Sequence, residues 1–562
     1  MKKLIIILAS IILVTCITTN TVRSIPEETG DIQRAPRSAP FSRGVNFSAW
    51  FESYSAQSIP FTRYTEQDFI NVKSLGADVI RLPVRMHSMT GGAPNYTIDP
   101  LLFRFLDQAI DWAEKHELYI IIDNHSFDPV RATDDNIDRI LLPVWEQIAR
   151  RYRNRSHFVI YEILNEPHGI SDERWGEIQG RAIDTIRQFD QNRLIIVGGT
   201  EYNSLGKLFA LPRYTDKNLI YTFHFYDPHL FTHQGATWGE PSLGNLSGVP
   251  FPAREGRMPR FPSELRGTWV EGAFYDYANA ARPSRLSGAL DGAVSFAIER
   301  DVPVFCGEFG VYLINSPKAD RVVWYDFVTR LLNTRNISWT MWDYFGGFGL
   351  FNTEQWGDFN SDLNVDVVAA LGFTPPVQVE KELMPLASGF SLFDDYPNRD
   401  LIIGFWGENT DFSLYDTNTT FGDFSIRWGN ALRYNVFYFG FGRNGDLSQL
   451  FNNGYALEFR ARTTKAVNFD VRFVNDESSS SIPWRMTYTI NENLLPADGR
   501  WHTIKIPFSQ MQDVGAWVIA TQSWMPSRGA FSWANIARLE FVAEYSDMDG
   551  TTVWFDEIKI TR

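Results

Sequence analysis

Two glutamates, Glu166 and Glu308, lie in surroundings that suit acid–base chemistry. Glu166 belongs to Ile163-Leu164-Asn165-Glu166-Pro167, where an apolar stretch stops at an amide, a carboxylate and a proline. Because proline lacks an N–H and moves the preceding residue out of the α region, we expect Glu166 at the end of a strand. Glu308 similarly follows the apolar run 302–306. A carboxyl held at a strand end suits proton transfer to a hydroxylated substrate.

Short apolar segments alternate with helical patterns between residues 41 and 374. We expect strands at 43–47, 78–84, 118–122, 158–164, 194–197, 219–225, 302–306 and 337–341. We expect helices at 65–75, 100–116, 134–152, 172–189, 283–300, 318–333 and 363–371. Eight such units in about 330 residues predict a (β/α)8 barrel of parallel strands covered by helices. A doubly wound open sheet is the alternative, but no glycine-rich phosphate loop follows the first strand.

Catalytic side chains of such a barrel lie at the carboxyl ends of its strands. Here those ends carry polar, charged or aromatic residues, namely Asn46, Arg81, Asp123, His125, Asn165, Glu166, Tyr202, His224, Tyr226, Glu308 and Trp342. Their convergence on one rim predicts a functional site. Glu162, inside a predicted strand, is expected to be structural. The long connection 227–282 carries Trp238 and Trp269, which are candidate platforms for a sugar ring.

The composition restricts the partners of this chain. The net charge is −15, which argues against nucleic acid or an acidic membrane surface. Aromatic residues make up 15% of the chain and suit stacking on the apolar faces of sugars. With Cys16 removed or modified, Cys306 is the remaining cysteine, so we expect a buried thiol and neither a disulfide nor a cysteine metal site.

The first residues have the pattern of a bacterial export signal. Lys2 and Lys3 precede the apolar run 4–14, which predicts a signal peptide over residues 1–24 and a leader or tether over 25–40. Leu13-Val14-Thr15-Cys16 resembles a lipoprotein box, although Thr15 departs from the small residue of that pattern. Two localisations remain open: a secreted protein, or a cell-surface lipoprotein anchored through Cys16.

The barrel region resembles glycoside hydrolase family 5, the retaining endoglucanase and mannanase group. The motifs that carry this resemblance are Ile163 to Pro167, Arg81-Leu82-Pro83, Asp123-Asn124-His125, His224-Phe225-Tyr226, Gly307-Glu308-Phe309-Gly310, Trp339 to Trp342, Gly44-Val45-Asn46 with Glu52, and the loop Phe231 to Gly235. Many members have a second histidine where this chain has Ser126.

The resemblance implies a role for each matching residue. Glu166 would be the acid/base and Glu308 the nucleophile of retaining hydrolysis, with carboxyls roughly 5 Å apart. Arg81 would keep Glu308 ionised with a low pKa. The residues expected to contact the sugar or to orient the carboxyls are Asn46, Arg81, His125, Asn165, Tyr202, His224, Tyr226, His233, Trp238 and Trp342, with Glu52 held more weakly. This chemistry requires no cofactor.

A second domain is expected after a linker at 375–388, which begins with Pro375-Pro376. Residues 389–562 show period-two stretches and no strong helical run, which predicts a β-sandwich or jelly roll. The domain resembles jelly-roll carbohydrate-binding modules, whose first and last strands lie together. That resemblance implies a structural Ca²⁺ held by Asp394, Asp395 and Asp556. The candidate sugar-binding aromatics are Trp406, Trp428, Tyr434, Tyr438, Trp484, Trp517, Trp524 and Trp533.

These features together predict a monomeric, secreted, retaining endo-β-1,4-glucanase that acts on plant polysaccharide. A β-mannanase and a xyloglucanase or mixed-linkage glucanase remain alternatives on the same scaffold. A catalytically inactive glycan-binding protein is an alternative of another class, but the presence of both glutamates argues against it.

Overall fold

The computed structural model describes residues 36–562 except 255, 355–356, 381, 383, 408–409, 443–444, 476–481 and 519–520. The predicted signal peptide 1–24, Cys16 and most of the leader 25–40 therefore lie outside the described residues. Among the described residues, no helix combines the length and the apolar character needed to span a bilayer.

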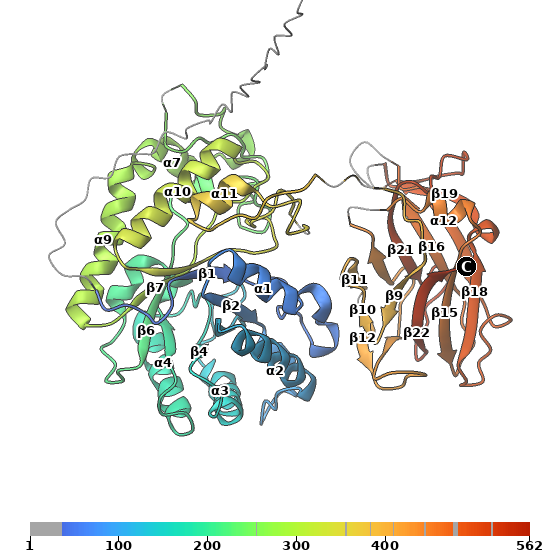
Figure 1. The fold of residues 1–562 in the computed structure, drawn as a ribbon, viewed down its shortest axis with the longest axis horizontal. Coiled ribbons are helices and arrows are strands. Elements are labelled where there is room, and N and C mark those ends of the chain that lie inside the picture. The colour runs from blue at the N-terminus through green and yellow to red at the C-terminus, as the bar shows by residue number, and fades with distance from the viewer. Residues whose placement is uncertain are drawn as a thin grey trace, which may run out of the picture.

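Eight parallel strands close into a barrel (Figure 1). They are β1 (Arg43–Asn46), β2 (Val79–Val84), β3 (Tyr119–Asn124), β4 (Val159–Glu162), β5 (Ile195–Gly198), β6 (Leu219–His224), β7 (Val304–Glu308) and β8 (Ser338–Met341). The ring closes where β1 pairs with β8, with Val45 opposite Met341. The predicted (β/α)8 barrel is confirmed, and the open sheet is excluded because no barrel strand is left at an edge.

Helices surround the barrel and cover its outer face. The long ones are α1 (Glu66–Ser74), α2 (Pro100–Lys115), α3 (Asp138–Tyr152), α4 (Asp172–Arg187), α9 (Pro283–Arg300) and α10 (Lys318–Thr334), followed by the short α11 (Val365–Ala370). α2 begins where Asp99 accepts a hydrogen bond from the Leu101 N–H and where proline occupies the first turn. Its spaced apolar residues are buried against the strands, as the sequence pattern predicts.

Short elements replace a long helix in two connections. After β5 the chain forms α5 (Thr200–Asn203) and a 3-10 helix over Leu205–Ala210. After β6 it forms α6 (His229–Thr232), a 3-10 turn at Ser263–Leu265, α7 (Trp269–Tyr275) and α8 (Tyr277–Ala280). Further 3-10 turns lie at Ala56–Ser58, Phe61–Arg63 and Met86–Met89. These irregular connections supply much of the site described below.

The barrel interior changes from apolar to charged along its strands. Val79, Ile121 and Ile160 belong to one buried apolar cluster on β2, β3 and β4. Two residues further along the same strands, Arg81, Asp123 and Glu162 are buried and paired with one another. Because strand side chains alternate with period two, each charged residue points inward directly above an apolar one.

The C-terminal domain is a sandwich of two mainly antiparallel sheets. One sheet contains β9 (Phe390–Asp394), β10 (Tyr396–Pro397), β12 (Asp411–Asp416), β13 (Ser425–Gly429), β15 (Ala456–Thr463), β18 (His502–Pro507) and β22 (Thr552–Thr561). The other contains β11 (Ile402–Trp406), β14 (Val436–Gly440), β16 (Phe469–Asn475), β17 (Arg485–Ile490), β19 (Gln512–Val518), β20 (Ser523–Met525) and β21 (Ile536–Val542). One short helix, α12 (Ser448–Asn452), precedes β15.

The core of this sandwich is aromatic. Phe437 and Phe541 stack with centroids 4.5 Å apart, and Phe459 and Phe555 both pack edge-on against Phe541. β9 pairs with β22, so the first and last strands lie together as predicted. The predicted jelly-roll class is confirmed.

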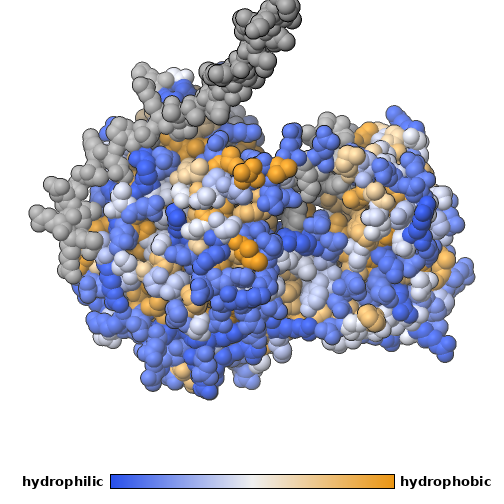
Figure 2. Space-filling model, in the orientation of Figure 1, coloured by the Kyte–Doolittle hydropathy of each residue, from blue (hydrophilic) through white to orange (hydrophobic). Residues whose placement is uncertain are grey.

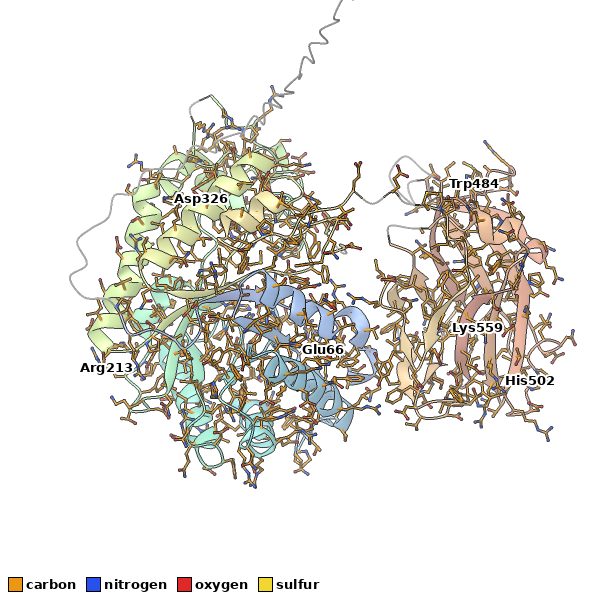
Figure 3. The ribbon with its side chains drawn as sticks, in the orientation of Figure 1. Glu66, Arg213, Asp326, Trp484, His502 and Lys559 are labelled. Atoms are coloured by element: carbon orange, nitrogen blue, oxygen red, sulfur yellow. The ribbon has the colours of Figure 1, made fainter. Side chains whose placement is uncertain are left out.

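The two domains touch. Figure 1 shows the sandwich beside α1 and α2, with β10 and β12 on its barrel side. At the start of α1, where Figure 3 labels Glu66, Arg399 of the sandwich donates a hydrogen bond of 2.8 Å to Thr65 Oγ1. The face drawn in Figure 2 is mainly hydrophilic over both domains.

Candidate active site

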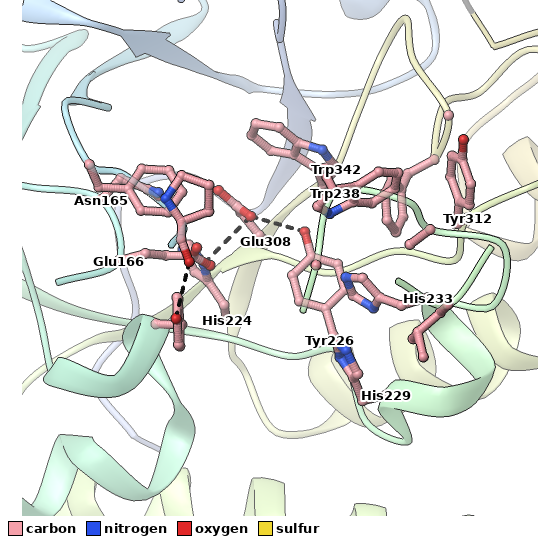
Figure 4. A pocket seen from close by; sticks show the side chains of 18 of the residues that line it. Asn165, Glu166, His224, Tyr226, His229, His233, Trp238, Glu308, Tyr312 and Trp342 are labelled. Atoms are coloured by element: carbon pink, nitrogen blue, oxygen red, sulfur yellow. Dashed lines mark hydrogen bonds and ion pairs between the residues drawn. The ribbon is translucent and has the colours of Figure 1, made fainter. Parts of the chain in front are cut away.

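Glu308 is the last residue of β7, and both of its carboxylate oxygens have partners. Oε1 accepts a hydrogen bond of 2.8 Å from Arg81 Nη1, and Oε2 accepts one of 2.9 Å from the Tyr226 hydroxyl. The side chain is almost fully buried at the bottom of a cavity. Figure 4 shows it facing Glu166 and Tyr226. The carboxylate is thereby fixed in orientation before any substrate arrives.

Glu166 lies beyond its strand rather than at its end. β4 stops at Glu162, and Glu166 has a left-handed backbone with φ of 46°. The predicted strand 158–164 was therefore too long at its carboxyl end. Such a conformation is costly for a residue with a Cβ, and residues held in this way are concentrated at functional sites.

The two carboxyls face each other across the cavity. His224 Nδ1 lies 2.6 Å from Glu166 Oε1 and 3.5 Å from Glu308 Oε2. One ligand-type atom from each of these three residues lies within 4.8 Å of the others. The structure therefore brings together the two glutamates that the sequence singled out.

Arg81 is a fully buried cation behind the cavity. It donates to both oxygens of Glu162 at 2.8 and 2.9 Å, and it lies 3.0 Å from Asp123. It also donates to Glu308 Oε1, Asn165 Oδ1 and Asn46 Oδ1. One guanidinium thus serves three carboxylates, and Glu162 has the structural role that the sequence predicted.

Asn46 and Arg81 do not line the cavity, so a sugar contact is corrected for both, whereas the expected position of Arg81 beside Glu308 is confirmed. Asn46 is fully buried, and its Nδ2 donates to the backbone carbonyls of Gly307 and Met341 at 3.1 Å. Its Oδ1 accepts from Arg81. Both side chains use their polar atoms inside the barrel and act on the site through Glu308 and Asn165.

The electrostatics of the two glutamates differ. Burial raises the pKa of Glu166 to about 7, against the opposing charges of His125 and Arg81. Burial also raises the pKa of Glu308, with Glu166 acting in the same direction and with His224 and Arg81 opposing. The expected low pKa of Glu308 is therefore corrected, because burial of the carboxyl outweighs the opposing charge of Arg81. Burial lowers the pKa of His224 to about 4, which leaves its imidazole neutral at neutral pH.

Asn165 offers a hydrogen-bond donor to the cavity. Its Oδ1 is held by Arg81 Nη2 at 2.8 Å, whereas its buried Nδ2 has no partner among the described residues. An unpaired buried N–H is costly, and a ligand hydroxyl can satisfy it. Ser126 does not line the cavity. Its Oγ accepts a hydrogen bond of 2.9 Å from the His87 N–H.

Trp342 and His125 form one side of the cavity. Their rings stack with centroids 5.6 Å apart and an interplanar angle of 14°. His125 Nδ1 is held by Asp123 Oδ2 at 2.7 Å, and its Nε2 lies 3.8 Å from Glu52 Oε1. Burial lowers the pKa of His125 and raises that of Glu52.

The opposite part of the cavity, whose volume is about 1050 Å³, is formed by loop aromatics. Tyr202 projects from a turn in which three successive residues, Glu201 to Asn203, have positive φ, and its ring stacks on His168 at 4.3 Å. His233 packs against Tyr226 and stacks on His229 at 4.0 Å. Trp238 and Trp269 are half exposed and also line the cavity, so all expected loop residues are present there.

Several cavity residues were not predicted. They include His229, Tyr312, Asp343 and Phe348. Asp343 directly follows Trp342, and His229 precedes His233 by four residues, so sequence proximity to predicted residues was the available signal. Tyr312 and Phe348 lie in loops without a regular pattern, and only the fold brings them to Trp238.

In the C-terminal domain, the three aspartates do not form a calcium site as placed. Asp556 Oδ2 accepts three hydrogen bonds from Thr419 and Thr420, and Asp395 Oδ1 accepts from the N–H groups of Asp423 and Phe424. Asp394 is exposed on β9. Among the described residues, no group of three acidic, histidine or cysteine side chains in this domain has converging ligand atoms. These residues therefore do not fit the ion, since Ca²⁺ needs several oxygens converging on one point.

The candidate aromatics of this domain divide by exposure. Trp428, Trp484 and Trp533 are buried, which makes them core residues. Trp406, Tyr434, Trp517 and Trp524 are about half exposed, and Tyr438 is partly buried. Trp517 and Trp524 are cross-strand partners on β19 and β20. Beside Trp524, a groove of about 410 Å³ is lined by Asp470, Arg472, Thr487, Thr489, Gln512 and Tyr545.

A (β/α)8 barrel with two buried carboxyls facing each other across its mouth defines a class of glycoside-cleaving hydrolases. The comparisons agree: residues 38–346 match the model of Cellulase (glycosyl hydrolase family 5), and residues 407–562 match Carbohydrate binding domain 30. The chain belongs to glycosyl hydrolase family 5.

Known proteins resemble the barrel region. Endoglucanase C of Acetivibrio thermocellus is 27% identical over 319 residues, covering 54% of this chain and 91% of that protein. Endoglucanase H of the same organism is 31% identical over 292 residues, covering 52% of this chain and 28% of that protein. The crystal structure of endoglucanase Cel5A from Thermotoga maritima is 27% identical, covers 59% of this chain and 96% of its own, and superposes with a TM-score of 0.49.

Proposed function

We propose that this chain is a retaining endo-β-1,4-glucanase in which Glu308 is the nucleophile and Glu166 the acid/base. The observation that carries the proposal is that one carboxylate oxygen of Glu166 and one of Glu308 lie within 4.8 Å of each other across the cavity. That separation suits direct attack on the sugar, whereas inversion requires room for a water at roughly 6.5–9.5 Å. The endoglucanases among the relatives support the choice of substrate.

In the first step, a Glu308 oxygen attacks the anomeric carbon while Glu166 gives its proton to the leaving oxygen. The pKa of about 7 keeps Glu166 protonated below neutrality, as this step requires. In the second step, Glu166 takes a proton from water, whose oxygen attacks the anomeric carbon and releases Glu308. Asn165 Nδ2 is placed to donate to the sugar 2-hydroxyl, a bond that strengthens in the transition state.

The direct test is NMR of the first product formed from a β-linked cello-oligosaccharide. We expect the β-anomer to appear before mutarotation, and an initial α-anomer would contradict the role of Glu308. A reducing-sugar assay on soluble cellulose, mixed-linkage glucan, xyloglucan and mannan tests the substrate. Higher kcat/KM on mannan or xyloglucan would favour the alternatives.

We also propose that the C-terminal domain binds β-glucan without cleaving it, because its match to a carbohydrate-binding domain accompanies the exposed pair Trp517 and Trp524. The side chains that line the neighbouring groove carry planar polar groups and hydroxyls, which can form hydrogen bonds with sugar hydroxyls. The test is retardation of the full chain in a gel that contains polysaccharide.

Export remains a proposal that rests on residues 1–24 alone. We propose that the protein leaves the cytoplasm and is either released or held by lipid on Cys16. Mass spectrometry of the mature N-terminus distinguishes a chain that begins after residue 24 from one that begins at a diacylated Cys16. An uncleaved Met1 in exported protein would contradict both.

A further inference from the structure

The loop between β1 and α1 has one end in the cavity and the other end against the C-terminal domain. Glu52 lines the cavity and lies 3.8 Å from His125 Nε2. Further along the same loop, Ile59, Phe61 and Thr62 contact residues of the sandwich. The loop is therefore a short physical connection between the two domains.

Tyr415 makes the central contact of this interface. It lies at a bulge in β12, where the pairing register with β13 shifts between Ser413 and Asp416, and a bulge redirects a side chain out of the regular alternation. Its hydroxyl donates to the Ile59 carbonyl and accepts a hydrogen bond of 3.2 Å from the Phe61 N–H. Only 5% of the residue is exposed.

Aromatic packing extends the contact on both sides of Tyr415. The Tyr415 ring meets Phe105 of α2 edge-on at 4.9 Å, and Phe105 stacks on Phe61 at 4.3 Å. Tyr396 of β10 packs against both Phe61 and Tyr415 at 5.9 Å. Thr62 Oγ1 donates to the Pro397 carbonyl at 2.6 Å. An interface of buried aromatic rings with satisfied backbone groups fixes the loop more strongly than exposed ion pairs would.

Two series of hydrogen bonds, linked by neighbouring residues of the chain, lead from this loop to the cavity. Through the first, the indole N–H of the fully buried Trp50 donates to the Phe61 carbonyl at 2.8 Å, and Trp50 is flanked by Ala49, whose N–H donates to Glu52. Through the second, the Tyr64 hydroxyl donates to the Ser48 carbonyl at 3.0 Å. The Ser48 hydroxyl in turn donates to Asp343, which also lines the cavity.

We propose that the C-terminal domain positions the β1–α1 loop of the catalytic barrel, with Tyr415 as a positioning residue that acts through Glu52. The proposal rests on the hydrolase function proposed above. The contact with the C-terminal domain should therefore affect kcat/KM even for a two-sugar substrate. Such a substrate gains nothing from glycan binding elsewhere on the protein.

The first experiment measures kcat and KM of the full chain on an aryl cellobioside. We expect Tyr415→Ala to lower kcat/KM about tenfold, mainly through KM, because small displacements of a binding group are costly. Tyr415→Phe, which keeps the ring and loses both hydrogen bonds, should fall between. Tyr455→Ala is the matched control, since Tyr455 packs on the core of the C-terminal domain near Gly389. Unchanged kcat/KM in both Tyr415 variants would overturn the proposal.

A double-mutant cycle tests whether Tyr415 acts through Glu52. We expect Glu52→Gln to lower kcat/KM and Tyr415→Phe to add little further loss in that background. Losses that multiply fully would show that Tyr415 acts by another route, such as general stability, and would overturn the assignment of Glu52.

Hydrogen–deuterium exchange of the full chain supplies a readout that needs no turnover. Peptides from residues 49–64 should exchange faster in Tyr415→Ala and Tyr415→Phe, while peptides from β4 to β7 stay as in the wild type. Unchanged exchange of 49–64 would overturn the proposal whatever the substrate is. If the wild-type chain cleaved no glycan, the proposed function would be refuted. The exchange of residues 49–64 would then still show whether Tyr415 positions the loop.

Discussion

Arg81 of β2 and Glu162 of β4 are joined across the barrel interior by two parallel hydrogen bonds of 2.8 and 2.9 Å. Both side chains are buried, and the remaining donors of Arg81 reach Asn46, Asn165 and Glu308. This pair therefore fixes the position of Arg81, which in turn holds Asn165 and Glu308 by hydrogen bonds.

Arg81→Met should destabilise the protein severely. Removal of the cation leaves Glu162, Asp123 and Glu308 as buried carboxylates without their counter-ion, and breaking a buried pair costs about 3–5 kcal/mol. Thermal unfolding should show a markedly lower Tm for the barrel. Glu162→Gln is the matched control, because it removes one negative charge and keeps its shape. A Tm in Arg81→Met equal to that of the control would contradict this account.

Glu308→Ala should abolish turnover with little change in the fold. Loss of the nucleophile should lower kcat at least about 1,000-fold, which corresponds to about 4 kcal/mol of transition-state stabilisation. Azide can occupy the vacated space and attack in its place, giving a glycosyl azide of inverted configuration from an aryl cellobioside. Glu299→Gln, an exposed glutamate on α9, is the control. Activity above a few per cent without azide would refute the role of Glu308.

The activity should follow a bell-shaped pH dependence. Glu166 must be protonated, so activity falls as the pH rises through about 7. Glu308 must be ionised, and since burial raises its pKa, activity falls on the acidic side above the pH at which an ordinary glutamate titrates. Glu166→Gln should remove the basic limb and lower kcat about 100- to 10,000-fold for poor leaving groups.

A dinitrophenyl leaving group provides the control for that experiment. Its departure needs no proton, so glycosylation of Glu166→Gln by such a substrate should approach the wild-type rate. Should the basic limb persist unchanged in Glu166→Gln, another group would have to carry the proton.

Trp517→Ala and Trp524→Ala should weaken binding to β-glucan. Both rings are about half exposed and adjacent across two strands, so each offers a face to a sugar. Affinity electrophoresis of the full chain, carrying Glu308→Gln to prevent hydrolysis, should show about tenfold weaker retardation for each variant. Phe421→Ala, which removes a more exposed aromatic from the loop between β12 and β13, should migrate as the parent does. Equal retardation of all three would place the glycan elsewhere.

The sequence predicted the barrel well because buried parallel strands are apolar runs and their helices carry a clear period. Glu166 and Glu308 were found for the same reason, as carboxylates that interrupt such runs. Arg81 was correctly expected beside Glu308, but the burial of Asn46 and Arg81 beneath the cavity was not foreseen, because strand residues two positions apart face the same side and the sequence does not show how deep along the strands the cavity reaches. The pKa of Glu308 was misjudged because the sequence does not reveal how completely the carboxyl is buried, and burial is the largest cause of the raised value.

The C-terminal domain shows where local pattern fails. Period-two alternation identified the sandwich, but it could not separate the core residue Trp428 from the exposed Trp524, since both lie in strands. Tyr415 gave no signal, because its orientation depends on a bulge and on a barrel loop more than 350 positions away.

The hydroxyl of Tyr415, shared between the Ile59 carbonyl and the Phe61 N–H, also sets a condition on domain exchange. A chimera that keeps the linker and replaces residues 389–562 with another sugar-binding sandwich would leave the rings of Phe61 and Phe105 facing water. If the β12 bulge, Tyr396 and Tyr415 were introduced into the new sandwich, its contact with the barrel would be preserved. In this enzyme, a replacement domain must accordingly supply the surface that contacts the barrel as well as the sugar-binding sandwich.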